Sequence, residues 1–101
     1  MFEPLDGPSS QLKVSVGTVT VVQVMVGGSE LVDRKAITLQ PEGKIYVYFG
    51  DNGAAPSAAT VSANGLIHQK DAKETYEAGE KQKVYMLSVS GTVNVIIVER
   101  A

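Results

Sequence analysis

The sequence has no cysteine, no tryptophan and only one histidine, His68, in 101 residues. Without cysteine the chain has no disulfide framework, no thiolate zinc site and no cysteine nucleophile, so cysteine usage gives no indication of the redox compartment. Zinc and iron sites need several His or Cys ligands, and a single histidine excludes such a centre. We therefore expect no cofactor, and we interpret His68 as a structural or surface residue.

Positive charge and long hydrophobic runs are also scarce. Nine Lys and Arg face eleven Asp and Glu, a net charge of -2, so the general attraction to phosphate on which most nucleic-acid binders rely is missing. The longest apolar runs, Val19–Val26 and Val93–Val98, are far shorter than the roughly 20 residues of a bilayer-spanning helix. Met1–Ser10 carries acids and two prolines rather than the pattern of a signal peptide. We expect neither a nucleic-acid nor a membrane partner, and an irregular N-terminal arm over residues 1–10.

β-Branched residues are abundant: 15 Val, 5 Ile and 6 Thr make up 26 of the 101 residues. These side chains favour an extended backbone. Short apolar runs separated by turn residues are typical of a sandwich or barrel. The sequence therefore predicts one all-β domain over residues 11–101, a single antiparallel β-sandwich or jelly-roll-like domain of about six to eight strands.

Hydrophobic alternation and turn residues locate the strands. The main expected strands are Leu12–Val16, Val19–Val26, Ala36–Gln40, Lys44–Phe49, Lys83–Ser90 and Thr92–Arg100. The turn at Pro41–Gly43 predicts a hairpin between the third and fourth of these. Ala58–Ala63 is expected to form a short strand. Lys70–Lys83 holds eight of the 20 charges and is expected to be a solvated edge or connection, although Lys70–Ala78 also has the composition of a short helix.

Two of the expected strands, Val19–Val26 and Val93–Val98, are apolar on both faces. A strand of a lone sandwich should instead alternate apolar and polar residues. Either a loop or helix of the same chain covers the outer face, or another protein copy does, and we favour the second explanation because a domain of this size is marginally stable alone. The candidate partner or subunit interface consists of Val22, Val24, Tyr46, Tyr48, Ile96 and Val98.

No pattern in the sequence predicts catalysis. Ser88–Gly91 lacks the first glycine and the helix of a nucleophile elbow, and Gly27–Gly28 is typical of a turn rather than a phosphate loop. Asp51–Gly53 could offer oxygens to calcium, but Asp-Asn-Gly is a common turn. Glu74, Glu77 and Glu80 lie among lysines and are expected to form a solvated face. We expect a protein that is not an enzyme.

Four segments together form a further pattern of strands and turns. A basic pair leads a strand that ends in Gln, a turn follows, a strand with Tyr and Gly closes a hairpin, and a Ser-Gly-Thr turn joins the last two strands. The segments are Leu31–Gly53, Gly65–Leu66, Glu77–Lys81 and Val84–Arg100. This pattern resembles small β-sandwich virion structural proteins of tailed bacteriophages.

The resemblance implies a structural role in the virion. Within that class we expect a capsid decoration or cement protein that binds the major capsid protein at the surface of the head, self-associates as a trimer, and is assembled in the host cytoplasm. One alternative is a head-tail connector or tail component, which would bind other virion proteins. A second alternative, from a different class, is a carbohydrate-binding module that uses the tyrosines, since Tyr binds both apolar and polar surfaces.

Overall fold

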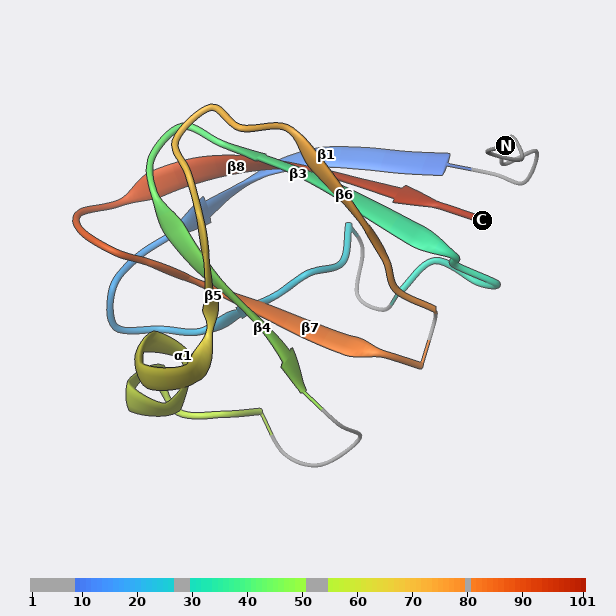
Figure 1. Cartoon of the computed structure of the whole chain (residues 1–101). Coiled ribbons are helices and arrows are strands. Elements are labelled where there is room, and N and C mark those ends of the chain that lie inside the picture. Colours follow the sequence, from blue (N-terminus) through green and yellow to red (C-terminus); the bar gives the residue numbers. More distant parts are fainter. Residues whose placement is uncertain (1–8, 27–29, 51–54, 80) are drawn as a thin grey trace.

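The computed structural model describes residues 9–26, 30–50, 55–79 and 81–101, and it shows two antiparallel sheets of four strands packed face to face (Figure 1). This confirms the expected all-β sandwich. The first strand begins at Ser9, so the last two residues that we assigned to the N-terminal arm belong to the sheet. The rest of the arm, residues 1–8, lies outside the described residues.

The eight strands divide equally between the two sheets. In spatial order, sheet A consists of β1 (Ser9–Val16), β8 (Val93–Arg100), β3 (Ala36–Pro41) and β6 (Glu74–Glu77). Sheet B consists of β2 (Val22–Gln23), β7 (Lys83–Ser88), β4 (Ile45–Gly50) and β5 (Leu66–His68). One short helix, α1 (Ala58–Asn64), lies between β4 and β5 in the described sequence and packs on the outside of sheet B (Figure 1).

The chain crosses between the sheets at nearly every connection. The expected hairpin around Pro41–Gly43 is therefore wrong, since β3 pairs with β6 and β8 while β4 pairs with β5 and β7. The turn lies over one end of the core, where Gly43 is so close to Val93 that a Cβ would come within 2.7 Å of its Cγ2. The residue types of a tight turn fix where the chain reverses, but not whether the returning strand pairs with its predecessor or with the opposite sheet.

The core lies between the two inner faces. Burial alternates along β8, with Val93, Val95, Ile97 and Glu99 buried and the residues between them more exposed, as expected of a strand with one face against a core. Sheet B contributes Ile45, Val47, Val84 and Met86 from its central strands. Phe49 and Tyr76 pack against this cluster of mainly aliphatic side chains, and the charged side chains of Arg34 and Glu99 are buried as well.

One expectation about the second half of the chain is wrong. Ala58–Ala63 is helical rather than extended, because Ser57 caps the helix by accepting a hydrogen bond from the Thr60 backbone N–H (3.2 Å) and alanines favour the helix. The short helix allowed for Lys70–Ala78 does not form. Its residues make a turn and then the edge strand β6, whose side chains are mostly exposed, which agrees with the expectation of a solvated edge.

Val19–Val26 is not the continuous two-faced strand that the alternation predicts. Only Val22–Gln23 is strand, Val19 is 82% exposed, and Val24 is fully buried in the core. Val24 donates its backbone N–H to the Val84 carbonyl (2.7 Å), and its own carbonyl accepts a hydrogen bond from the Arg34 guanidinium (3.0 Å). The path of this segment therefore depends on the buried Arg34 side chain and on one backbone bond to β7, and not on a continuous β-ladder.

Arg34 and Glu99 form a buried ion pair at the open end of the core, with Arg34 Nη1 2.9 Å from Glu99 Oε2 and both side chains at most 1% exposed. Arg34 uses all five of its donors: Nε bonds to the Ala78 carbonyl, Nη1 to Val24 and Glu99, and Nη2 to the carbonyls of Gly79 and Gln82. The pair thus connects β8 to the chain before β3 and to the turn between β6 and β7.

The Glu99 carboxylate holds the irregular chain between β2 and β3. Its Oε1 accepts the Val26 backbone N–H (2.8 Å), and its Oε2 accepts the Leu31 backbone N–H (3.1 Å) in addition to the Arg34 guanidinium. Both charges are therefore paired and hydrogen-bonded, which is the condition under which a buried ion pair is tolerated.

Substitution of Glu99 tests this arrangement. We expect Glu99→Gln to lower the free energy of unfolding by about 3–5 kcal/mol, because it leaves the Arg34 charge buried and unpaired. Glu42→Gln is the matched control, because it breaks the exposed ion pair between Lys13 and Glu42, whose side chains are 54% and 49% exposed. This variant should lose at most about 1 kcal/mol of unfolding free energy. Urea denaturation of the two variants measures the difference, and equal small losses would contradict the role given to Glu99.

Candidate interaction surfaces

The six residues of the expected interface do not form one surface. Val24 lies in the core, and Val22 is partly buried against it, so the expectation is wrong for Val24 and Val22 faces inward. Tyr46 and Tyr48 lie on the outer face of sheet B, while Ile96 and Val98 lie on the outer face of sheet A. The error follows from the assumption of a regular strand over Val19–Val26, which β2 does not provide.

Helix α1 covers part of the outer face of sheet B. Beneath it β7 is buried on both faces, with Tyr85 and Leu87 4% and 2% exposed, and Val61 is the buried anchor of the helix. Gly65 at the end of α1 lies so near Tyr46 that a Cβ would be 3.1 Å from the tyrosine Cβ. The two-faced strand of this fold is thus β7, and its cover comes from the same chain.

The outer face of sheet A is mostly polar around two half-buried aliphatic side chains, Ile96 and Val98. Their neighbours on the adjacent strands are Lys13, Gln40, Gln11 and Thr38. A small apolar centre with a polar surround is a common arrangement in protein interfaces. Of the six residues of the expected interface, Ile96 and Val98 are the two that lie in an apolar centre with polar neighbours.

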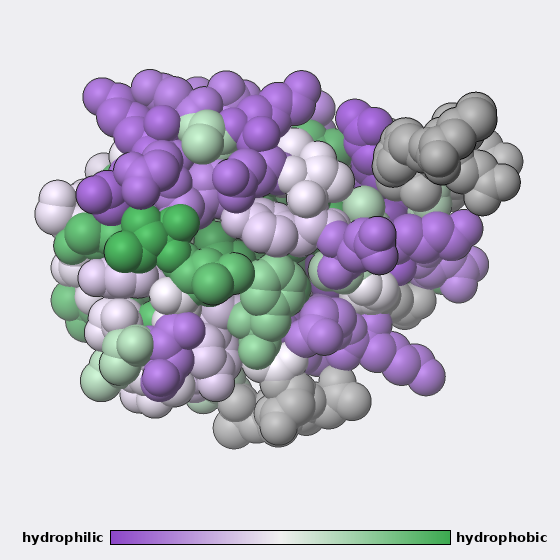
Figure 2. Space-filling view, viewed as in Figure 1, coloured by the Kyte–Doolittle hydropathy of each residue, from purple (hydrophilic) through white to green (hydrophobic). Residues whose placement is uncertain are grey.

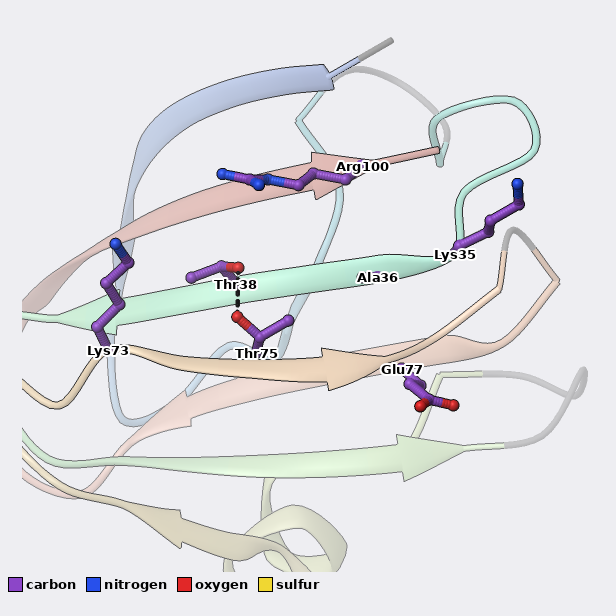
Figure 3. Close-up of a pocket in the computed structure, with 7 residues that line it drawn as sticks. All are labelled: Lys35, Ala36, Thr38, Lys73, Thr75, Glu77 and Arg100. Carbon is purple, nitrogen blue, oxygen red and sulfur yellow. Dashed lines mark hydrogen bonds between the residues drawn. The ribbon is translucent and has the colours of Figure 1, made fainter. Parts of the chain in front are cut away.

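A hollow of about 580 Å³ lies beside this pair, over β3 and β6 (Figure 3). Its lining consists of Lys35, Ala36, Thr38, Lys73, Thr75, Glu77 and Arg100. The hydroxyls of Thr38 and Thr75 are hydrogen-bonded at 2.8 Å. Sequence reasoning missed this site, because its three basic residues are far apart in the chain and only the pairing of β3 with β6 and β8 brings them together.

The edge strand β5 exposes a second apolar surface. Leu66 and Ile67 are 56% and 57% exposed, and among the described residues β5 pairs on one side only, with β4. Figure 2 shows apolar surface over this part of the molecule, beside the hydrophilic surface of sheet A. An apolar edge strand with an unpaired side is a surface on which another chain can pack. No pattern in the sequence indicated that this segment lies at the edge of a sheet.

His68 is buried beside this edge. Its Nε2 is 2.6 Å from the Ala72 carbonyl oxygen, and its Nδ1 is 3.1 Å from the Tyr76 hydroxyl. Tyr76 donates to Glu74 Oε2 (2.8 Å) and packs edge-on against Phe49. Burial raises the pKa of Tyr76 above its usual value, and the hydrogen bond to the Glu74 carboxylate raises that pKa further, so the hydroxyl keeps its proton. The interpretation of His68 as a structural residue agrees with these contacts.

Buried polar groups in the described residues are engaged within the fold. Every buried side-chain nitrogen or oxygen there has a hydrogen-bond partner. Glu30 is an example: burial raises its pKa, but the hydrogen bond and charge of Lys83 (2.7 Å) outweigh this, so that its pKa lies below the ordinary value.

Across residues 9–26, 30–50, 55–79 and 81–101 no three His, Asp or Glu side chains gather as a metal site, and no helix has the length and hydropathy to cross a bilayer. The calcium candidate Asp51–Gly53 and the turn at Gly27–Gly28 lie outside the described residues.

In comparisons with known proteins, no family model, no curated protein and no solved structure matches the chain.

The environment of His68 predicts its tautomer. A carbonyl oxygen only accepts hydrogen bonds, so Nε2 must carry a proton to bond to Ala72. We expect ¹⁵N NMR to show a protonated Nε2 at neutral pH, both in the native chain and in Tyr76→Phe, which removes the contact at Nδ1. That variant should also lose about 1 kcal/mol of unfolding free energy. An imidazole protonated at Nδ1 alone would contradict the assignment.

Proposed function

We propose that this chain is a structural protein of a tailed-bacteriophage virion, a capsid decoration protein that binds the major capsid protein and stabilises the head. The proposal starts from the resemblance of Leu31–Gly53 and Val84–Arg100 to small β-sandwich virion proteins. The observation that carries it is the apolar edge strand β5, on which Leu66 and Ile67 are more than half exposed. In a virion such an edge would be covered by a neighbouring subunit.

The chemistry of the interior supports an assembly role over catalysis. Glu99 and His68 are the buried side chains most suited to acid-base work, and each is hydrogen-bonded to the backbone of its own fold. Groups held in this way stabilise the fold and have no lone pair or proton directed at a substrate. What the described residues offer to other molecules is their surface.

The tyrosines give little support to a carbohydrate-binding module. Tyr46 lies against the end of α1, and Tyr48 lies on the same half-covered face of sheet B. A sugar ring stacks on an open aromatic face, and both side chains are partly buried here. A head-tail connector or tail component remains the second candidate, because a ring of subunits would cover the same β5 edge.

Copy number in purified particles tests the proposal. In virions of the phage that encodes this chain, densitometry should find hundreds of copies for a decoration protein, and a dozen or fewer for a ring component. The native chain should bind to particles that lack it. Leu66→Ser with Ile67→Ser should bind at least about tenfold more weakly, since each exposed aliphatic side chain contributes on the order of 1 kcal/mol when covered.

The matched control is Val19→Ser with Val32→Ser, which removes two aliphatic side chains that are 82% and 67% exposed elsewhere. This variant should bind like the native chain. Absence of the protein from particles would overturn the virion proposal. Equal loss of binding in both double variants would overturn the assignment of the β5 edge.

A further inference from the structure

The hollow on the outer face of sheet A concentrates positive charge in a chain whose net charge is negative. Three of its seven lining residues are basic, Lys35, Lys73 and Arg100, against one acid, Glu77. In Figure 3 the side chains of Lys73 and Arg100 extend toward the strands around Thr38, whereas Glu77 extends below β6, away from Thr38. The part of the hollow over Thr38 and Thr75 is therefore positively charged.

None of these three cations is neutralised by an ion pair among the described residues. The ion pairs of the described residues involve Lys13, Arg34, His68 and Lys83, so Lys35, Lys73 and Arg100 have no carboxylate partner in that part of the chain. Elsewhere on the surface Lys13 and Lys83 are each bonded to a glutamate. The hollow is thus a place where cations gather with their charge available to a ligand.

The floor of the hollow adds a hydrogen-bond donor. Thr38 and Thr75 carry one hydroxyl hydrogen each, and their mutual hydrogen bond at 2.8 Å uses one of the two. Among the described residues the second hydrogen has no acceptor. Ala36, the neighbour of Arg100 and Glu77 across the strands, has a small side chain that keeps the floor low. An acceptor oxygen can therefore reach the threonine pair between the basic side chains.

The length of the hollow fits an extended chain. Lys35 comes one residue before Ala36, and Lys73 comes one residue before Glu74, which pairs with Leu39. The two lysines are thus separated by about five residues of strand, or about 16 Å. That spacing suits carboxylates four or six residues apart, which share one face of an extended peptide, and it is too long for one phosphate ion.

We propose that this hollow binds an extended acidic segment of another protein, whose carboxylates contact Lys73, Arg100 and Lys35. A protein segment fits better than a nucleic acid, because nucleic-acid binding needs a broad basic surface and this chain carries a net charge of -2. Charge complementarity of this kind gives specificity and speeds association. The inference goes beyond the virion proposal and does not rest on it.

A labelled hexaglutamate peptide is a direct probe. At low ionic strength we expect fluorescence anisotropy to show saturable binding that weakens with added salt. Lys73→Gln with Arg100→Gln should weaken this binding by about five- to thirty-fold, the loss expected from two exposed charge pairs. Lys44→Gln with Lys70→Gln removes the same charge from exposed positions outside the hollow and should change the affinity less than twofold. Unchanged thermal midpoints of both variants confirm that they fold.

NMR titration locates the peptide. Shifts centred on the backbone amides of Ala36, Thr38 and Thr75 support the proposal. It is overturned if hexaglutamate does not bind, if the control variant loses as much affinity as the hollow variant, or if the shifts centre on the neighbouring depression around Gly79 and Lys81. Tighter binding of a hexathymidylate or of inorganic phosphate than of hexaglutamate would likewise overturn it, in favour of a phosphate site.

Discussion

The buried Arg34–Glu99 pair is the interaction on which the shape of this sandwich depends. Besides the bond between the two side chains, six hydrogen bonds run from the pair to the chain between β2 and β3 and to the turn between β6 and β7. These are segments where β-ladders are short or missing, so side chains supply the order that backbone pairing supplies elsewhere. Because all five guanidinium donors and both carboxylate oxygens are hydrogen-bonded, the pair is tolerated in a largely apolar core. Lys35, which lines the hollow, follows Arg34 directly in the chain.

The sequence predicted the fold class well, because the abundance of β-branched residues and the alternation along Leu12–Val16 and Val93–Arg100 are local signals of strands. It also predicted the turns at Pro41–Gly43 and Ser90–Thr92, because turn residues are local signals as well. It failed where the outcome depends on distant residues. Val24 is buried because Arg34 and Val84 bond to its backbone, and the strands on either side of Pro41–Gly43 pair with other strands because the chain crosses the core there. No local pattern contains that information.

The outer surfaces likewise divide into features that the sequence could predict and features that it could not. Ile96 and Val98 could be assigned to an outer face from alternation along one strand, and the structure places both on the outside of sheet A. The hollow could not, because Lys35, Lys73 and Arg100 become neighbours only through the register of three strands. The β5 edge depends on the order of strands in sheet B. The apolar edge and the basic hollow are the two surfaces through which we propose that the chain binds other proteins.

Amide hydrogen exchange at Val26 and Leu31 tests most directly whether the Arg34–Glu99 pair orders the chain around it. Both residues lie outside the strands, and both donate their backbone N–H to the Glu99 carboxylate. If that carboxylate is the anchor, these two amides exchange as slowly as the amides of the central strands β7 and β8, through opening of the whole fold. Exchange at the rate of an exposed loop, with β7 and β8 still protected, would contradict the account.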